Sequence, residues 1–275
     1  MTTATHTAPL PTTLRIGVAR GVLEVKQFFR ERDAVIFTFT LPAFILLMLG
    51  FIFNEPLDGY PGVTVSQIFA ASMIAYGILS TAFLNIGVGI ATDREDGTLK
   101  RLHGTPATAG TYLIGKIILV LVTTAAEVVL LLGVGVAFFD LKLPQDAGRW
   151  VTFGWLFVLS VVACTLLGVA ASSVARSAKS AAAVLNLPVI GLQFVSGIFV
   201  DIASLPDAMV KVASIFPVKW MGQGFRSVFL PDELAAQEVA GQWEHGRIAL
   251  VLGAWCVVGL VLALATFRWT DRRTR

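Results

Sequence analysis

The chain has 275 residues, of which 56% are hydrophobic and only 14% are charged, and this composition excludes an ordinary soluble domain. The formal net charge of +3 gives no reason to expect nucleic acid as a partner, because the basic residues of so apolar a chain suit anionic lipid headgroups. Its two cysteines, Cys164 and Cys256, fall within apolar stretches and indicate neither a disulfide framework nor a zinc site.

Residues 1–13 are rich in Thr, Ala and Pro, and we predict a disordered tail that lacks the pattern of a secretory signal peptide. From residue 14 to residue 33, apolar side chains recur at helical spacing opposite a basic face. This pattern predicts an amphipathic helix in the membrane interface, with a cytosolic helix packed on the protein as the alternative. The apolar positions are Leu14, Val18, Val22, Val25 and Phe29.

Residues 34–275 contain six apolar stretches, each long enough to cross a bilayer core, which takes about 20 helical residues. Helices are expected because irregular backbone in lipid would leave its amide groups unpaired. The predicted fold class is therefore an all-α polytopic membrane protein with six transmembrane helices. The predicted spans are Ala34–Phe53, Gln67–Ala91, Tyr112–Phe139, Val151–Val174, Ser180–Val200 and Ile248–Arg268.

The distribution of Lys and Arg predicts that both termini lie in the cytoplasm. With that orientation the inner segments hold fourteen basic residues and the outer segments hold six. The inner residues precede the first span, separate the second from the third and the fourth from the fifth, and follow the sixth.

A charged segment, Thr92–Pro106, connects the second and third predicted spans. Thr92 and Glu95 have the spacing of a capping box, which predicts the amino end of a short helix whose first turn is acidic. The acidic residues are Asp93, Glu95 and Asp96.

Gly97 is expected to bend this segment, and Thr98–Leu102 to form a further turn that ends at Gly104 and Pro106. Such a turn would place Leu99 and Leu102 on one side, where they could dock in a groove of a soluble partner. An ordinary solvated loop, whose basic residues keep it inside, is the alternative.

Gly110–Ile117 has the spacing of a phosphate-binding loop as far as Lys116. However, Ile117 stands where a Ser or Thr hydroxyl would bind magnesium, and no buried strand precedes the segment. Lys116 is instead expected to snorkel at the cytoplasmic entrance of the third span. We therefore predict that the chain does not hydrolyse ATP by itself.

Polar side chains are scarce within the predicted spans, and Glu127 lies near the middle of the third. A charge there costs about 2.5–3.5 kcal/mol on insertion scales, so Glu127 must face protein or water, or be protonated. It is a candidate residue of a transport pathway, and hydrogen bonding between helices is the alternative. Weaker candidates for the pathway are Asn85, Asn186 and Gln193.

The charged segment resembles a loop of ABC-2 type permeases, the membrane subunits of exporters such as the daunorubicin-resistance type. The family pattern there is approximately (E/D)-R-E-x-G-T-L-(E/K)-x-L-x-x-T-P. Two later stretches, Ser196–Phe199 with Leu205-Pro206 and Phe216-Pro217 with Arg226, resemble the S-G-x-F…L-P and N-P…R elements, although Phe216 replaces Asn. The matching loop residues are Asp93, Arg94, Glu95, Asp96, Gly97, Thr98, Leu99, Lys100, Arg101 and Leu102, then Thr105 and Pro106.

The resemblance implies a six-helix ABC-2 type transmembrane domain over residues 34–275, in which Asp93–Leu102 is the coupling helix. Two permeases, most economically a homodimer of this chain, would sit on two copies of a cytoplasmic ABC ATPase subunit. A heterodimer with a second permease is the alternative. ATP and Mg would bind at that ATPase, so this chain would bind no cofactor or metal and carry no catalytic residue.

The resemblance further implies export of an amphipathic drug, lipid or lipid-linked product across a bacterial inner or plasma membrane, a function that includes multidrug efflux and antibiotic resistance. In the family, Asp201–Arg247 would hold re-entrant helices that cap the outer end of the pathway. A lid resting on the membrane surface is the alternative. Either arrangement predicts Lys219, Trp220 and Arg226 at the membrane–water boundary.

Two other classes of function are weighed against an ATP-driven exporter. An ion- or proton-coupled secondary transporter would use Glu127 as its coupling carboxylate, but the inverted repeats of many such carriers are not evident. An intramembrane enzyme would need paired catalytic residues or metal-ligand spacing, which the sequence lacks.

Overall fold

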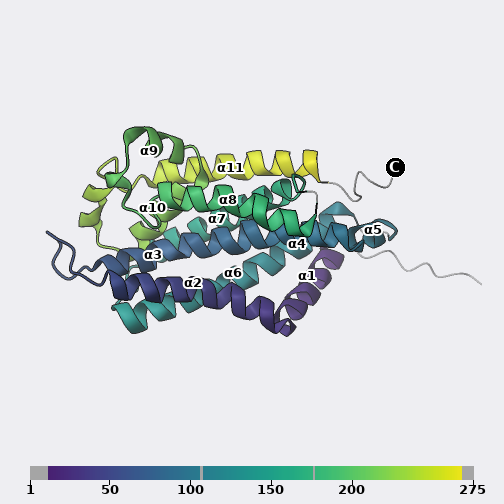
Figure 1. Cartoon of the computed structure of the whole chain (residues 1–275), viewed down its shortest axis with the longest axis horizontal. Coiled ribbons are helices and arrows are strands. Elements are labelled where there is room, and N and C mark those ends of the chain that lie inside the picture. The colour runs from purple at the N-terminus through teal and green to yellow at the C-terminus, as the bar shows by residue number, and fades with distance from the viewer. Residues whose placement is uncertain (1–11, 106–107, 176, 268–275) are drawn as a thin grey trace, which may run out of the picture.

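The computed structural model of the chain describes residues 12–105, 108–175 and 177–267. Apart from one β-bridge between Pro56 and Thr64, regular structure in these ranges is helical. Long helices run side by side along one axis (Figure 1). The short helix α5 (Thr98–His103) lies at one end, and α9 (Asp207–Ala213) and α10 (Pro217–Phe229) lie towards the other. We refer to these as the α5 end and the α10 end.

Six helices in the described ranges are long and apolar enough to cross a membrane, which confirms the predicted all-α fold class. The second is a continuous helical stretch of α3 (Val65–Ile78), the π-helical segment η1 (Leu79–Asn85) and α4 (Ile86–Glu95). The other five are α2 (Arg32–Ile52), α6 (Ala109–Phe139), α7 (Ala147–Ala171), α8 (Ala178–Val195) and α11 (His245–Thr266).

The fifth span is shorter than predicted, because α8 ends at Val195 and not at Val200. Gly197 has φ +77°, a left-handed conformation that glycine adopts without a steric penalty, and it turns the chain away from the helix axis. The predicted end of the sixth span at Arg268, the turn at Pro106 and the basic residue Arg176 lie outside the described residues.

The amphipathic segment forms α1 (Thr13–Arg30), whose N-cap Thr12 accepts a hydrogen bond from the Arg15 amide. The helix begins one residue before the predicted start, and the tail prediction falls mainly on residues 1–11, outside the described ranges. α1 packs along α6 through Gly17 and Gly21. Its predicted place in the membrane interface stays a prediction.

The α10 end is built around α10, a helix of thirteen residues that are all buried. α10 packs against α3, α7 and α11, so it is inserted among the long helices and does not rest on their surface as a lid. Lys219, Trp220 and Arg226 have side chains buried inside the chain, and their place at the membrane–water boundary stays a prediction. In the chain, the short helices η2 (Ile202–Ser204) and α9 precede this buried helix, and η3 (Asp232–Gln237) follows it.

Candidate functional site

The charged segment begins as the last turn of a long helix and not as the first turn of a new one. α4 continues through Thr92 to Glu95, and the Thr92 hydroxyl donates to the Val88 carbonyl oxygen within that helix. The capping box predicted at Thr92 and Glu95 is therefore wrong. Thr92 and Glu95 lie inside a helix that continues from the second span, where the backbone amides are already hydrogen-bonded to carbonyl groups one turn earlier.

α5 is a separate short helix that starts after a left-handed glycine. Gly97 has φ +78°, and Asp96 Oδ1 accepts a hydrogen bond of 2.8 Å from the Thr98 amide. The hydrogen bonds from Thr98 lower the pKa of the Asp96 carboxyl, which is therefore ionised at neutral pH. Arg101 donates back to the Thr98 hydroxyl over 3.0 Å. The turn predicted over Thr98–Leu102 is present.

Asp93 connects α4 directly to α6 and, through Lys116, to α1. Its Oδ2 accepts a hydrogen bond of 2.7 Å from the Tyr112 hydroxyl and lies 2.9 Å from Lys116 Nζ, both on α6. Lys116 Nζ also lies 3.3 Å from Glu24 Oε2 on α1, and Glu24 pairs in turn with Arg20 at 2.8 Å. These mostly buried charges join α1, α4 and α6 in one network.

Lys116 therefore does not snorkel towards headgroups as predicted, because it is buried between two carboxylates. The Gly110–Ile117 segment forms the first turns of α6 and not a glycine-rich loop.

The next two residues of the segment reach the other side of the bundle. Arg94 Nη1 donates to the Ser172 carbonyl oxygen, at the end of α7, over 3.0 Å. Glu95 Oε2 accepts a hydrogen bond of 2.6 Å from the Ala178 amide, the first residue of α8. Consecutive side chains thus fasten α4 to α6, α7 and α8, and we call Asp93, Arg94 and Glu95 the brace.

The surface that α5 offers to a partner is polar and mostly basic. Leu99 is 0% exposed, so the expectation that it docks in a partner is wrong; it packs in this chain's own core. Leu102 is half-buried against the same core. The exposed side chains between the brace and α6 include Asp96, Lys100, Arg101 and His103.

Glu127 lies in the protein interior. It is 0% exposed, and its Oε2 accepts a hydrogen bond of 2.6 Å from the hydroxyl of Thr81, in the π-helical segment η1. The expectation that it faces protein is met. No sequence signal pointed to Thr81 as its partner, because the register of a π-helical turn cannot be read from apolar periodicity.

The other predicted pathway residues do not share one environment within this chain. Asn85 is exposed and donates over 3.4 Å to Thr38 on α2, while Asn186 is exposed and donates to Ala182 in its own helix. Gln193 is buried like Glu127. The structure therefore does not bring these four residues together as one site.

A second buried ion pair, at the α10 end, was missed by sequence reasoning. Arg226 Nη2 lies 2.7 Å from Glu238 Oε1, and its Nη1 donates to Ser72 and to the Gly197 carbonyl oxygen. The sequence indicates Arg226 as part of a motif that resembles the family's and as a residue of the membrane–water boundary, but not as a member of an ion pair. Glu238 carries no pattern that would mark it, since its partner lies on another element.

Comparison with known proteins identifies one family. The family model described as ABC-2 type transporter matches residues 21–230, from α1 through the end of α10. The matched range contains the brace, α5 and Glu127. No curated protein matches the chain.

Proposed function

Because the chain belongs to the ABC-2 type transporter family, we propose that it is the permease subunit of an exporter driven by a separate ABC ATPase. The cargo would be an amphipathic drug, lipid or lipid-linked molecule moved outward across a bacterial plasma membrane. ATP and Mg would bind at the ATPase, and this multi-pass chain would provide the path through the membrane.

The observation that carries this proposal is the brace beside α5. The brace precedes α5 in the chain. Its three side chains contact α6, the end of α7 and the start of α8 at donor–acceptor distances of 2.6–3.0 Å. Short charge-assisted bonds of this kind hold helix ends in a fixed relation. α5 would act as the coupling helix, and movement of the ATPase would shift the spans together.

The charges on α5 indicate what the partner surface should look like. Lys100 and Arg101 are exposed on consecutive positions. Complementary charge fixes the orientation of an interface and speeds its assembly, so the groove of the ATPase would be acidic. The α5 end would then lie in the cytoplasm, in agreement with the excess of basic residues expected on that side.

The assembly would contain two permeases and two ATPases. α8 supports a permease–permease contact, because its exposed face is apolar at Val184, Leu187 and Ile190 and carries Asn186. A second copy of this chain would cover part of that face and form the homodimer.

Transport into inside-out vesicles tests the function. The chain is reconstituted with its ATPase, and uptake of a cationic dye and of a fluorescent phospholipid is followed with and without ATP. We expect uptake to require both ATP and the ATPase and to continue after the proton gradient is collapsed. Uptake that persists without the ATPase but stops with the gradient would favour a secondary transporter that uses Glu127.

Charge reversal on α5 tests the docking surface. The double variant Lys100→Glu with Arg101→Glu should lower co-purification of the ATPase by roughly tenfold or more, since two attractive pairs become repulsive. The matched control is Lys142→Glu with Lys211→Glu, which reverses two exposed lysines that do not lie on α5. Equal recovery of the ATPase with both double variants would remove α5 from the interface.

A further inference from the structure

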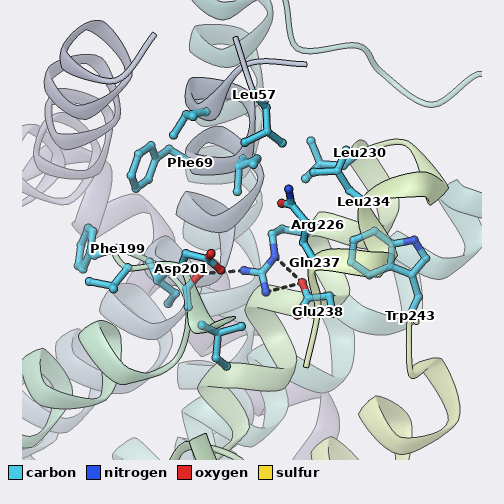
Figure 2. A pocket seen from close by; sticks show the side chains of 16 residues that line it. Leu57, Phe69, Phe199, Asp201, Arg226, Leu230, Leu234, Gln237, Glu238 and Trp243 are labelled. Carbon is cyan, nitrogen blue, oxygen red and sulfur yellow. Dashed lines mark hydrogen bonds and ion pairs between the residues drawn. The ribbon is translucent and has the colours of Figure 1, made fainter. Parts of the chain in front are cut away.

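A cavity of about 200 Å³ lies at the α10 end, where the start of α3, the turn after α8 and η3 meet. Phe69 and Phe199 lie on one side of it, Leu234 and Trp243 on the other, and Arg226 lies between them (Figure 2). Most of the lining is apolar. Such a concave, largely apolar wall with a few polar groups is the usual form of a small-molecule site.

The charged groups on the wall are unevenly matched. Arg226 uses Nε and Nη2 for Glu238 Oε1, and Nη1 for Ser72 and Gly197. The other oxygen, Glu238 Oε2, is buried without a hydrogen-bond partner among the described residues. Asp201 also lines the cavity, so its wall carries one guanidinium and two carboxylates.

Two consequences follow for a ligand. An anion gains little, because the guanidinium already makes four contacts with protein oxygens, one from Nε, one from Nη2 and two from Nη1. The net charge of the three wall groups is −1, from one Arg and two acids, which favours a cation.

We propose that this cavity is a binding site for a small amphiphilic monocation. Its apolar body packs between the Phe69 and Trp243 sides, and its ammonium group pairs with the carboxylate of Asp201, the exposed acid of the wall. The volume sets the size, because a cavity of about 150 Å³ holds a benzene molecule, so this one admits a single ring with a short charged arm. The site goes beyond the proposed function, since binding here requires neither ATP nor the ATPase.

Equilibrium binding of radiolabelled 2-phenylethylammonium to the full chain in phosphatidylcholine nanodiscs tests the site, with empty nanodiscs subtracted. The neutral and anionic comparison compounds are 2-phenylethanol and phenylacetate. We expect saturable binding of the cation with an affinity roughly tenfold or more above both. Equal affinities for cation and anion, or no saturable binding of the cation, would overturn the proposal.

A space-filling variant locates the binding. Val65→Phe adds volume to the cavity wall and should weaken binding of the cation by about tenfold or more. The matched control, Val212→Phe, makes the same change at an exposed position of α9 and should leave binding unchanged. Unaltered binding in Val65→Phe would place the ligand elsewhere.

Two charge variants test the role of the carboxylates. Asp201→Asn keeps an oxygen that can accept from the Ala203 amide while removing one negative charge, and it should weaken binding several-fold. Asp207→Asn is the control, at an exposed position that does not line the cavity. Undiminished binding in Asp201→Asn would contradict the charge argument.

Glu238→Gln keeps an acceptor for Arg226 and removes one negative charge from the wall, so binding of the cation should weaken. If this variant does not fold, Val65→Phe and Asp201→Asn decide the question. Failure of all three variants to affect binding, with ATP-driven vesicle transport intact, would overturn the cavity site and leave the proposed function standing.

Discussion

At the scale of single residues, the Glu127 carboxyl packs directly against Gly77. A Cβ atom at position 77 would lie 2.7 Å from Glu127 Oε1, closer than real Cβ contacts. The carboxyl is buried between α3, η1 and α6, and one of its oxygens accepts from Thr81. In this arrangement Glu127 has no contact with lipid or water, which favours a role in holding these helices together over a role in the pathway.

Substitution of Gly77 tests this packing. Gly77→Ala should destabilise the chain by about 1–3 kcal/mol, because the added methyl group must displace a buried side chain. Glu127→Ala in the same chain should remove most of that penalty. Gly89→Ala is the matched control on the same helical stretch, since a Cβ there meets nothing within 4 Å. Thermal unfolding of Gly77→Ala, Glu127→Ala, the double variant and Gly89→Ala in detergent measures the effect, and equal melting temperatures for Gly77→Ala and Gly89→Ala would refute it.

At the scale of elements, α1 presents two distinct faces. Gly17, Gly21 and Glu24 are buried against α6, and Cβ atoms at the two glycines would lie 2.7 Å from Ile114 and Ile118. Leu14, Val18 and the other outward apolar side chains remain exposed. The glycines allow the two helices to approach closely and bring Glu24 within reach of Lys116. The exposed apolar face is suited to lipid, as the interfacial prediction requires.

Enlarging Gly21 should release α1 from α6. Gly21→Leu has no space beside Ile118, so we expect α1 to lift off and its Glu24–Lys116 contact to break. Hydrogen exchange followed by mass spectrometry should show faster exchange of the α1 amides, with the spans unchanged. Val22→Leu, at the neighbouring exposed position, is the control. Equal protection of α1 in both variants would show that the helix does not depend on this contact.

At the scale of the whole molecule, one continuous helical stretch joins the two ends. Residues Val65–Glu95 run from the wall of the cavity at the α10 end to the brace at the α5 end. Between them lies η1, where the π-helical turn places Thr81 against Glu127. Such turns are frequent at functional sites. A displacement of the brace would therefore act on the same helix that forms the cavity wall.

Removal of the Lys116 charge should separate binding of the ATPase from transmission of its movement. Lys116→Met leaves the Glu24 and Asp93 carboxylates without their shared cation, which loosens the link between α1, α4 and α6. We expect the ATPase to co-purify normally, because the exposed face of α5 is intact, while the amount of cargo moved per ATP hydrolysed falls by roughly tenfold. Lys211→Met is the control. A normal ratio of transport to hydrolysis in Lys116→Met would contradict a transmitting role for the network.

Several properties of this protein follow from its sequence because they depend on local composition. The six spans, the amphipathic α1 and the turn at Gly97 can each be predicted from a short run of residues, since bilayer thickness and glycine geometry act on that run alone. The family resemblance rests on the charged loop and two later short motifs, and the family match over residues 21–230 confirms it.

Other properties were decided only by the tertiary structure, because they depend on which helices meet. The sequence pattern predicted that Leu99 docks in a partner and that Lys116 snorkels at the membrane entrance. In the structure Leu99 is buried in the chain's own core, and Lys116 pairs with acids on α1 and α4. The burial of α10 and the pairing of Arg226 with Glu238 depend likewise on contacts between distant segments. A buried charge is stable only beside its partner, and a partner many residues away has no trace in the local pattern.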